Sequence, residues 1–276
     1  MTVRGSDTTG RFTERHVSAD GFKVRYLDGG GGPTVVMIHG GGGLDGELND
    51  AHGLLADRYR VVALEMPGWG AEPNPRTQSL REMAATMAAA IEAAGIDHYR
   101  LIGTSLGAVV AAWIAAERPG AVSALVLEAP AVFRAGAPRP GEGGGPPDPA
   151  AFNYKPEKRW QRAPTPEQME LMRRLPTPGD TEVDLAARLP DLQVPTLIVF
   201  GRHDGLFSPA RVAEHYRVLP PGHLTVFEEA AHDVKGDRPE AFAGVVDRFF
   251  RDGLGAVPEV IVPDDDPWRG ERDAHR

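Results

Sequence analysis

A short turn at residues 103–107 constrains this chain more than any other feature. The turn reads Gly-Thr-Ser-Leu-Gly, with Ser105 at its centre, after an apolar run at residues 99–102 and before an alanine-rich run at residues 106–117. The pattern predicts a strand, a sharp turn and a helix. The backbone of a serine at such an apex is strained, and small flanking residues let strand and helix approach closely. Ser105 is therefore a candidate nucleophile at the edge of a sheet.

Three further segments follow predicted strands where a serine nucleophile would need its partners. Residues 39–43, His-Gly-Gly-Gly-Gly, offer unhindered backbone N–H groups that could face a developing oxyanion. Asp204 follows the β-rich run at residues 195–200, and His232 follows a strand-like run at residues 223–227. The resulting chain order of serine, acid and histidine is one of the known orders of a catalytic triad.

These four motifs together resemble the α/β-hydrolase superfamily, and the resemblance runs from about Arg11 to Phe250. The turn at residues 65–70 is similar to the family's acidic-x-Pro-Gly-aromatic-Gly turn, with Glu65 where Asp is usual. Strands and helices also alternate after residue 34, which by itself predicts parallel strands joined by helical crossovers. The resemblance implies an α/β-hydrolase fold, a mostly parallel central sheet flanked by helices, with a lid insertion.

The resemblance also implies a role for each motif residue. Ser105 would be the nucleophile, His232 the general base that later protonates the leaving group, and Asp204 the carboxylate that fixes the histidine tautomer. The oxyanion donors would be the backbone N–H groups of Gly41 and Leu106. Residues expected at the substrate pocket are Gly42, Trp69, Phe133 and Trp160.

Other residues compete for the roles of acid and base. Glu128 ends the strand that follows the predicted elbow helix, a position from which some family members supply their acid. Glu128 is therefore an alternative acid. It could instead line the pocket or pair with an arginine of the lid. His203 and Asp233 flank the chosen acid and base and could exchange roles with them. His39 is predicted to anchor the oxyanion loop. The remaining histidines occupy no motif and are interpreted as surface or strand-end residues: His16, His52, His98, His215, His223 and His275.

The alternation of strands and helices divides the chain. Residues 1–130 and 191–252 are predicted to form the hydrolase core, and residues 131–190 a lid or cap insertion. The insertion holds a Gly/Pro tract, predicted to be a mobile flap, and a helix from Pro166 that opens on a capping box. Residues 253–276 form a C-terminal extension with a β-like run, predicted to be partly disordered.

Composition excludes several classes of function. The 276 residues carry a formal net charge of -9 and no Lys/Arg cluster, which argues against nucleic acid, and they contain no cysteine. The longest apolar stretch is shorter than a membrane span, and the polar N-terminal residues lack the apolar core of a secretion signal, so a cytoplasmic protein is expected. The glycines lack the spacing of a phosphate-binding loop. No metal or organic cofactor is implied, the expected partner is a small-molecule substrate, and an oligomer remains possible.

Serine chemistry with an oxyanion hole favours attack on an acyl carbon, so a carboxylic ester, lactone or thioester is the leading substrate class. The first alternative is a carbon–carbon bond hydrolase of the meta-cleavage-product type. That group has Asn before the nucleophile and Trp after the histidine, whereas this chain has Thr104 and Asp233. The alternative from another class is a catalytically silent ligand-binding protein on the same fold.

Overall fold

The structure is a computed structural model that describes residues 8–132, 149–155, 164–176, 181–207 and 222–261. Phe133, Trp160, most of the Gly/Pro tract and the acidic C-terminal end lie outside these described residues.

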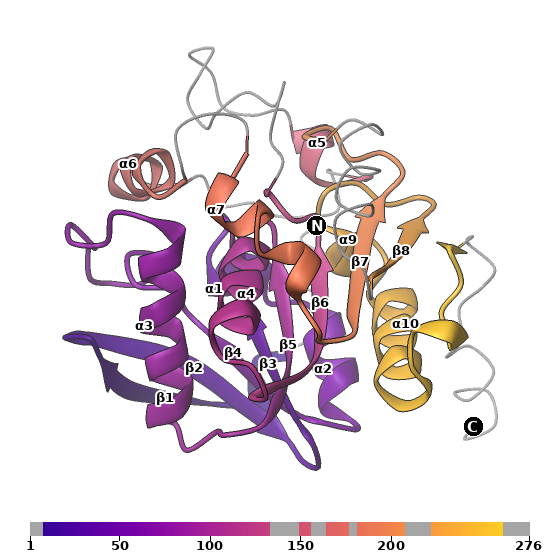
Figure 1. The fold of residues 1–276 in the computed structure, drawn as a ribbon, viewed down its shortest axis with the longest axis horizontal. Coiled ribbons are helices and arrows are strands. Elements are labelled where there is room, and N and C mark those ends of the chain that lie inside the picture. Colours follow the sequence, from indigo (N-terminus) through magenta and orange to yellow (C-terminus); the bar gives the residue numbers. More distant parts are fainter. Residues whose placement is uncertain (1–7, 133–148, 156–163, 177–180, 208–221, 262–276) are drawn as a thin grey trace.

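The described strands form one sheet in the order β1-β2-β4-β3-β5-β6-β7-β8-β9. β1 pairs with β2, and β2 with β4, in antiparallel register, and every other neighbouring pair is parallel, which confirms the mostly parallel sheet. The short β9, in the C-terminal extension, adds a parallel edge beside β8 (Figure 1). The strands are β1 (Phe12–Ala19), β2 (Phe22–Gly30), β3 (Thr34–Ile38), β4 (Arg60–Leu64), β5 (Tyr99–Thr104), β6 (Val122–Glu128), β7 (Thr196–Gly201), β8 (Gly222–Phe227) and β9 (Val260–Ile261).

Helices cover both faces of the sheet because the central strands are apolar on both sides. In β3, Val36 and Ile38 belong to one buried cluster, and Val35 and Met37 belong to another, as the two-residue period of a strand requires. α3 and α4 pack in the first cluster, and α2 and α10 pack in the second. The helices and short 3-10 turns are η1 (Thr8–Arg11), α1 (Leu44–Glu47), α2 (Asp50–Ala56), α3 (Leu80–Ala93), α4 (Leu106–Glu117), α5 (Pro149–Phe152), α6 (Pro166–Arg174), α7 (Val183–Ala186), η3 (Leu189–Asp191), α9 (Val234–Asp237), α10 (Pro239–Asp252) and η4 (Leu254–Ala256).

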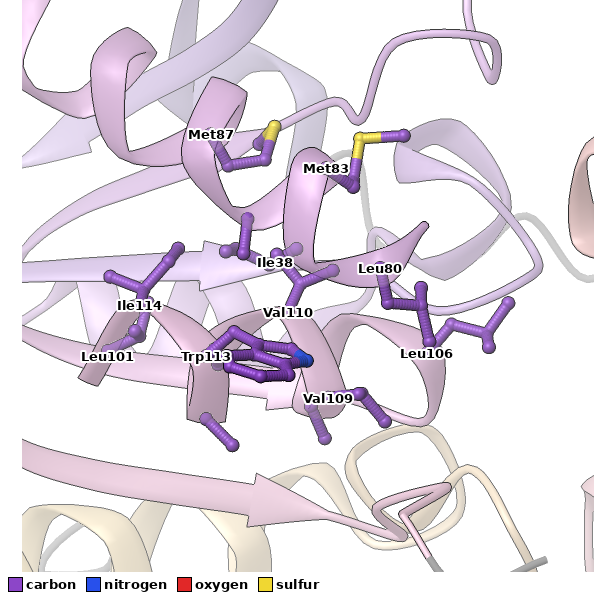
Figure 2. Packing of buried hydrophobic residues seen from close by; sticks show 14 of the residues in the cluster. Ile38, Leu80, Met83, Met87, Leu101, Leu106, Val109, Val110, Trp113 and Ile114 are labelled. Atoms are coloured by element: carbon purple, nitrogen blue, oxygen red, sulfur yellow. The ribbon is translucent and has the colours of Figure 1, made fainter. Parts of the chain in front are cut away.

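α4 lies inside the protein rather than on its surface. Every residue from Leu106 to Ala115 is buried, because β5 lies beneath the helix and α3 beside it. Figure 2 shows Val110 and Trp113 of α4 in the same packed cluster as Met83 and Met87 of α3. A helix that is apolar on all sides is stable only when it is enclosed. Its N-terminus, which follows Ser105, is therefore held in a fixed position.

The described parts of residues 131–190 contain helices and contribute no strand to the central sheet. α5 and α6 lie at the end of the sheet where β7 and β8 have their C-terminal ends (Figure 1). The predicted capping box before α6 is confirmed, because the Thr165 and Gln168 side chains bond each other's backbone N–H groups. α6 is attached to the core through Arg174, which donates to the carbonyls of Asn74 and Thr77.

Within the described residues, no helix combines the length and the apolar character needed to cross a bilayer.

Candidate active site

Ser105 lies in a tight turn between β5 and α4. Its backbone has φ 53° and ψ −113°, in a region that non-glycine residues rarely adopt, so the expectation of a strained turn is confirmed. A Cβ on Gly103 would lie 2.6 Å from the Cα of Ala108, and a Cβ on Gly107 would collide with the carbonyl oxygen of His39. The two glycines thus permit the close approach that the turn requires.

The loop after β3 lies against this turn. A Cβ on Gly40 would be 3.1 Å from the Cβ of Ser105. The carboxylate of Glu47 accepts hydrogen bonds from the N–H groups of Gly40, at 2.9 Å, and Gly42, at 3.1 Å. Within the described part of the chain, the N–H groups of Gly41 and Leu106 have no recorded acceptor. These two N–H groups are the predicted oxyanion donors.

His39 and Trp69 hold this loop in place. Nε2 of His39 accepts from the N–H of Met66 at 2.9 Å, so Nδ1 carries the proton and donates to the carbonyl of Gly40 at 2.7 Å. Burial is the main cause that lowers the pKa of His39, and the ring is therefore neutral. The indole of Trp69 donates to the carbonyl of Gly41 at 3.0 Å and packs edge-on against His39. The prediction that His39 anchors the loop is confirmed.

His232 and Asp204 meet although 28 residues separate them. Nδ1 of His232 lies 3.0 Å from Oδ2 of Asp204, and the two side chains are only 6% and 2% exposed. Oδ1 of Asp204 accepts from the N–H groups of Leu206 and Phe207, which fixes the carboxylate. Nε2 of His232 is buried and has no hydrogen-bond partner among the described atoms. The histidine therefore keeps one nitrogen available for another group.

Charged neighbours determine the pKa of His232. Burial is the largest cause and by itself would lower this pKa. The charge and hydrogen bond of Asp204, together with the charges of Glu128 and Asp233, outweigh burial, so the pKa is raised above its ordinary value of 6.5. The imidazole ring packs against Phe152 of α5 and against Phe207, with ring centroids 5.8 and 5.6 Å away.

Glu128 ends β6 and is completely buried. Its carboxylate accepts from the hydroxyl of Thr104 at 2.6 Å and from the N–H of Lys235 at 2.7 Å. Burial is the main cause that raises its pKa. The partner suggested by the sequence, an arginine of the lid, is wrong: the cation beside Glu128 is Lys235, whose Nζ lies 3.2 Å away.

Sequence reasoning missed several residues at this end of the sheet. Glu47 and Lys235 belong to no motif, and no sequence pattern marks them as buried. Met172 of α6, in contrast, belongs to the predicted lid insertion, and it lies over the loop after β3, since a Cβ on Gly41 would be 3.0 Å from its sulfur. His52, interpreted as a surface residue, is buried and closes the capping box of α2, because the polar Asn49 before the helix offers it a partner.

The predicted pocket residues have different surroundings. Gly42 donates its N–H to Glu47, and Trp69 is only 6% exposed because it packs on the loop after β3. Among the described residues, no group of three His, Cys, Asp or Glu side chains is arranged to hold a metal ion. The hydroxyl of Ser105, the imidazole of His232 and the carboxylate of Asp204 are groups capable of nucleophilic and acid–base chemistry.

Comparison with known proteins agrees with this geometry. The family profile described as alpha/beta hydrolase fold matches residues 33–166, which include the loop after β3 and the Ser105 turn. The chain belongs to the α/β-hydrolase superfamily. A solved membrane phospholipase A is similar to this α/β-hydrolase over 88% of the chain and 87% of its own length, with 25% identity and a TM-score of 0.67. The 2-hydroxy-6-oxo-6-phenylhexa-2,4-dienoate hydrolase from Rhodococcus sp. strain RHA1 shares the fold, with 19% identity over 87% of this chain and 99% of its own and a TM-score of 0.72.

Curated relatives match a shorter part of this α/β-hydrolase. The acetyltransferase component of the acetoin cleaving system of Cupriavidus necator is 41% identical over 117 residues, which are 41% of this chain and 31% of that protein. A putative carbamate hydrolase, RutD, of Klebsiella pneumoniae is 39% identical over 99 residues, which are 35% and 37% of the two chains. The α/β-hydrolase thus spans about a third of the length of these relatives.

Proposed function

We propose that this chain is a serine hydrolase that cleaves a small-molecule carboxylic ester, lactones and thioesters included, through an acyl-enzyme on Ser105. One observation carries the proposal. A serine in a strained turn lies at the same end of the sheet as a buried histidine that is bonded to an aspartate through Nδ1 and has Nε2 free. A serine hydroxyl is a weak nucleophile without an adjacent base. A histidine oriented in this way is the base that it needs.

The proposed reaction has two half-reactions. Oγ of Ser105 attacks the substrate carbonyl carbon while Nε2 of His232 takes the hydroxyl proton. His232 then gives this proton to the leaving alcohol or thiol, and the acyl group remains on Ser105. A water molecule, deprotonated by the same nitrogen, attacks the acyl-enzyme and releases the acid. Asp204 stabilises the transient imidazolium and does not itself accept the proton.

The N–H groups of Gly41 and Leu106 are proposed to bind the oxyanion. Glu47 occupies the N–H groups on both sides of Gly41, which leaves the Gly41 N–H as the free donor of the loop. The N–H of Leu106 begins α4, where the first N–H groups of a helix have no partner within the helix. Donors that are already in position stabilise the charge without reorganisation.

The similarity to a solved phospholipase A supports the ester class. Carbon–carbon bond cleavage is less favoured than ester cleavage. The two residues at which this chain departs from the meta-cleavage-product hydrolases, Thr104 and Asp233, are engaged with other side chains. Thr104 donates to Glu128, and Asp233 caps α9 and pairs with Lys235. Ligand binding without turnover would support the silent-protein alternative.

Labelling with a serine-directed fluorophosphonate tests the proposal without knowledge of the substrate. We expect one covalent adduct per chain by intact-mass spectrometry in the wild type and none in Ser105→Ala. A panel of esters, thioesters and a meta-cleavage product then assigns the class of bond. A folded wild type that gains no adduct and hydrolyses nothing in the panel would contradict the proposal.

The pH dependence tests His232 as the base. The base works only when it is neutral, and its raised pKa means that protonation begins at a higher pH than in a free histidine. We therefore expect kcat/KM to fall on the acid side with a midpoint above 6.5. A rate that stays constant down to about pH 5 would be inconsistent with a histidine base.

A further inference from the structure

Lys235 is a buried cation among three carboxylates. Its side chain is 2% exposed, and its Nζ lies 3.1 Å from Asp233, 3.2 Å from Glu47 and 3.2 Å from Glu128. The three carboxylates come from separate parts of the chain, and Glu47 and Lys235 are 188 positions apart. Charged side chains are almost never fully buried unless they are paired, so this arrangement is a built feature of the fold.

Each carboxylate also touches a different part of the proposed catalytic machinery. The Glu128 carboxylate binds Thr104, the residue before the candidate nucleophile. The backbone carbonyl of Glu128 accepts from the N–H of Ser105 at 2.8 Å. Asp233 follows His232 directly and caps the short helix that carries Lys235. A single ammonium group thus joins the nucleophile turn to the histidine loop.

Glu47 connects Lys235 to the loop that carries Gly41. Its Oε1 accepts from the N–H groups of Gly40 and Gly42, the residues on either side of the proposed oxyanion donor Gly41. The Glu47 carboxylate is therefore close to the place where the oxyanion would form. An uncompensated negative charge there would oppose the negative charge that develops on the substrate oxygen. Its Oε2 is the atom that pairs with Lys235.

The charges in this region are weakly screened. The cavity between Glu47, Lys235 and Thr104 has a volume of about 10 Å³, which is about the space that one water molecule needs. Burial by itself would lower the pKa of Lys235, but Asp233, Glu128 and Glu47 outweigh it and the pKa is raised. Lys235 therefore remains protonated across the pH range in which His232 can act as a base.

We propose that Lys235 is a positioning residue whose ammonium group neutralises the Glu47 carboxylate, so that the oxyanion loop keeps its shape without repelling the oxyanion. The inference rests on the proposed function and adds to it a residue that no motif contains. Lys235 acts through Glu47 and the loop, and it does not contact the substrate.

The test compares Lys235→Met with the double variant Glu47→Gln/Lys235→Met. Methionine keeps the length of the lysine stem without its charge, and glutamine can still accept both loop N–H groups through its oxygen. We expect Lys235→Met to lower kcat for an ester by about 100-fold with KM within about threefold, since loss of oxyanion stabilisation affects the transition state. The double variant is expected to regain at least about tenfold in kcat. Lys23→Met, at an exposed lysine of β2, is the matched control and should equal the wild type.

The outcomes separate the two proposals. If the wild type neither reacts with the fluorophosphonate nor hydrolyses any ester, the proposed function fails and this inference fails with it. If the wild type is active and Lys235→Met keeps its kcat, the proposed function stands and the role of Lys235 is wrong. A Lys235→Met defect that the second substitution does not relieve would also overturn charge neutralisation.

A variant pair at Glu47 covers the case in which Lys235→Met does not fold. Glu47→Gln keeps the loop bonds and removes the charge, whereas Glu47→Ala removes both. Charge neutralisation by Lys235 predicts that Glu47→Ala loses at least about tenfold more kcat than Glu47→Gln, because only in the alanine variant is the loop no longer held. Equal losses in the two variants would show that the carboxylate charge itself is needed, contrary to the inference.

Discussion

Replacing Ser105 with alanine is expected to lower kcat for an ester by about 10⁴-fold to 10⁶-fold, while the protein remains folded. No covalent intermediate can form without the hydroxyl oxygen, and the remaining donors supply only part of the catalysis. Alanine and serine both carry a Cβ and have the same difficulty at φ 53°, so the turn should persist. The measurement is steady-state turnover of wild type and variant purified in parallel, with thermal unfolding of each.

A second serine substitution provides the control for this experiment. Ser123 is an exposed serine at the start of β6 that donates to the carbonyl of Tyr99. Ser123→Ala is expected to keep the wild-type rate and stability. Residual turnover in Ser105→Ala above about a tenth of the wild-type rate would assign the nucleophile to another residue.

The Ser105 turn could be predicted from sequence because its determinants are local. An apolar strand, two glycines and an apolar helix lie within 20 residues, and the steric requirement at Gly103 comes from Ala108 in the same turn, although that at Gly107 comes from the carbonyl of His39. The sheet could be predicted for a similar reason, since strands buried on both faces read as continuous apolar runs. The meeting of His232 with Asp204 was inferred from chain order and family resemblance rather than from local chemistry.

The buried charges could not be predicted in this way. The segment Asp233–Arg238 contains four charged residues, a composition typical of a solvated loop. Lys235 is buried only because Glu47 and Glu128 approach it from distant segments, and a single sequence carries no record of such a meeting. The burial of His52 has a local cause instead, since its capping partner Asn49 lies three residues away. The sequence therefore predicted the Ser105 turn and the His232–Asp204 pair better than the charged residues that surround them.

The second large effect is expected at the acid that orients His232, for which Asp204 and Glu128 are the two candidates. Asp204→Asn is expected to lower kcat by about 10⁴-fold, because asparagine no longer holds Nδ1 of His232 as the proton donor and Nε2 then carries the proton it should accept. The loss of the Asp204 charge also removes the largest cause that raises the pKa of His232. The acid limb of kcat/KM should therefore move to lower pH in the residual activity.

Glu128→Gln is the matched comparison for Asp204→Asn, since both replace a buried carboxylate with its amide. Glu128 bonds Thr104 and Lys235, while Nδ1 of His232 is bonded to Asp204, so the loss at Glu128 should fall on stability. Breaking one side of a buried ion pair costs about 3 kcal/mol in unfolding free energy. We expect kcat to change by less than about tenfold in this variant. If Glu128→Gln lost more activity than Asp204→Asn while remaining folded, Glu128 would be the acid that orients the base.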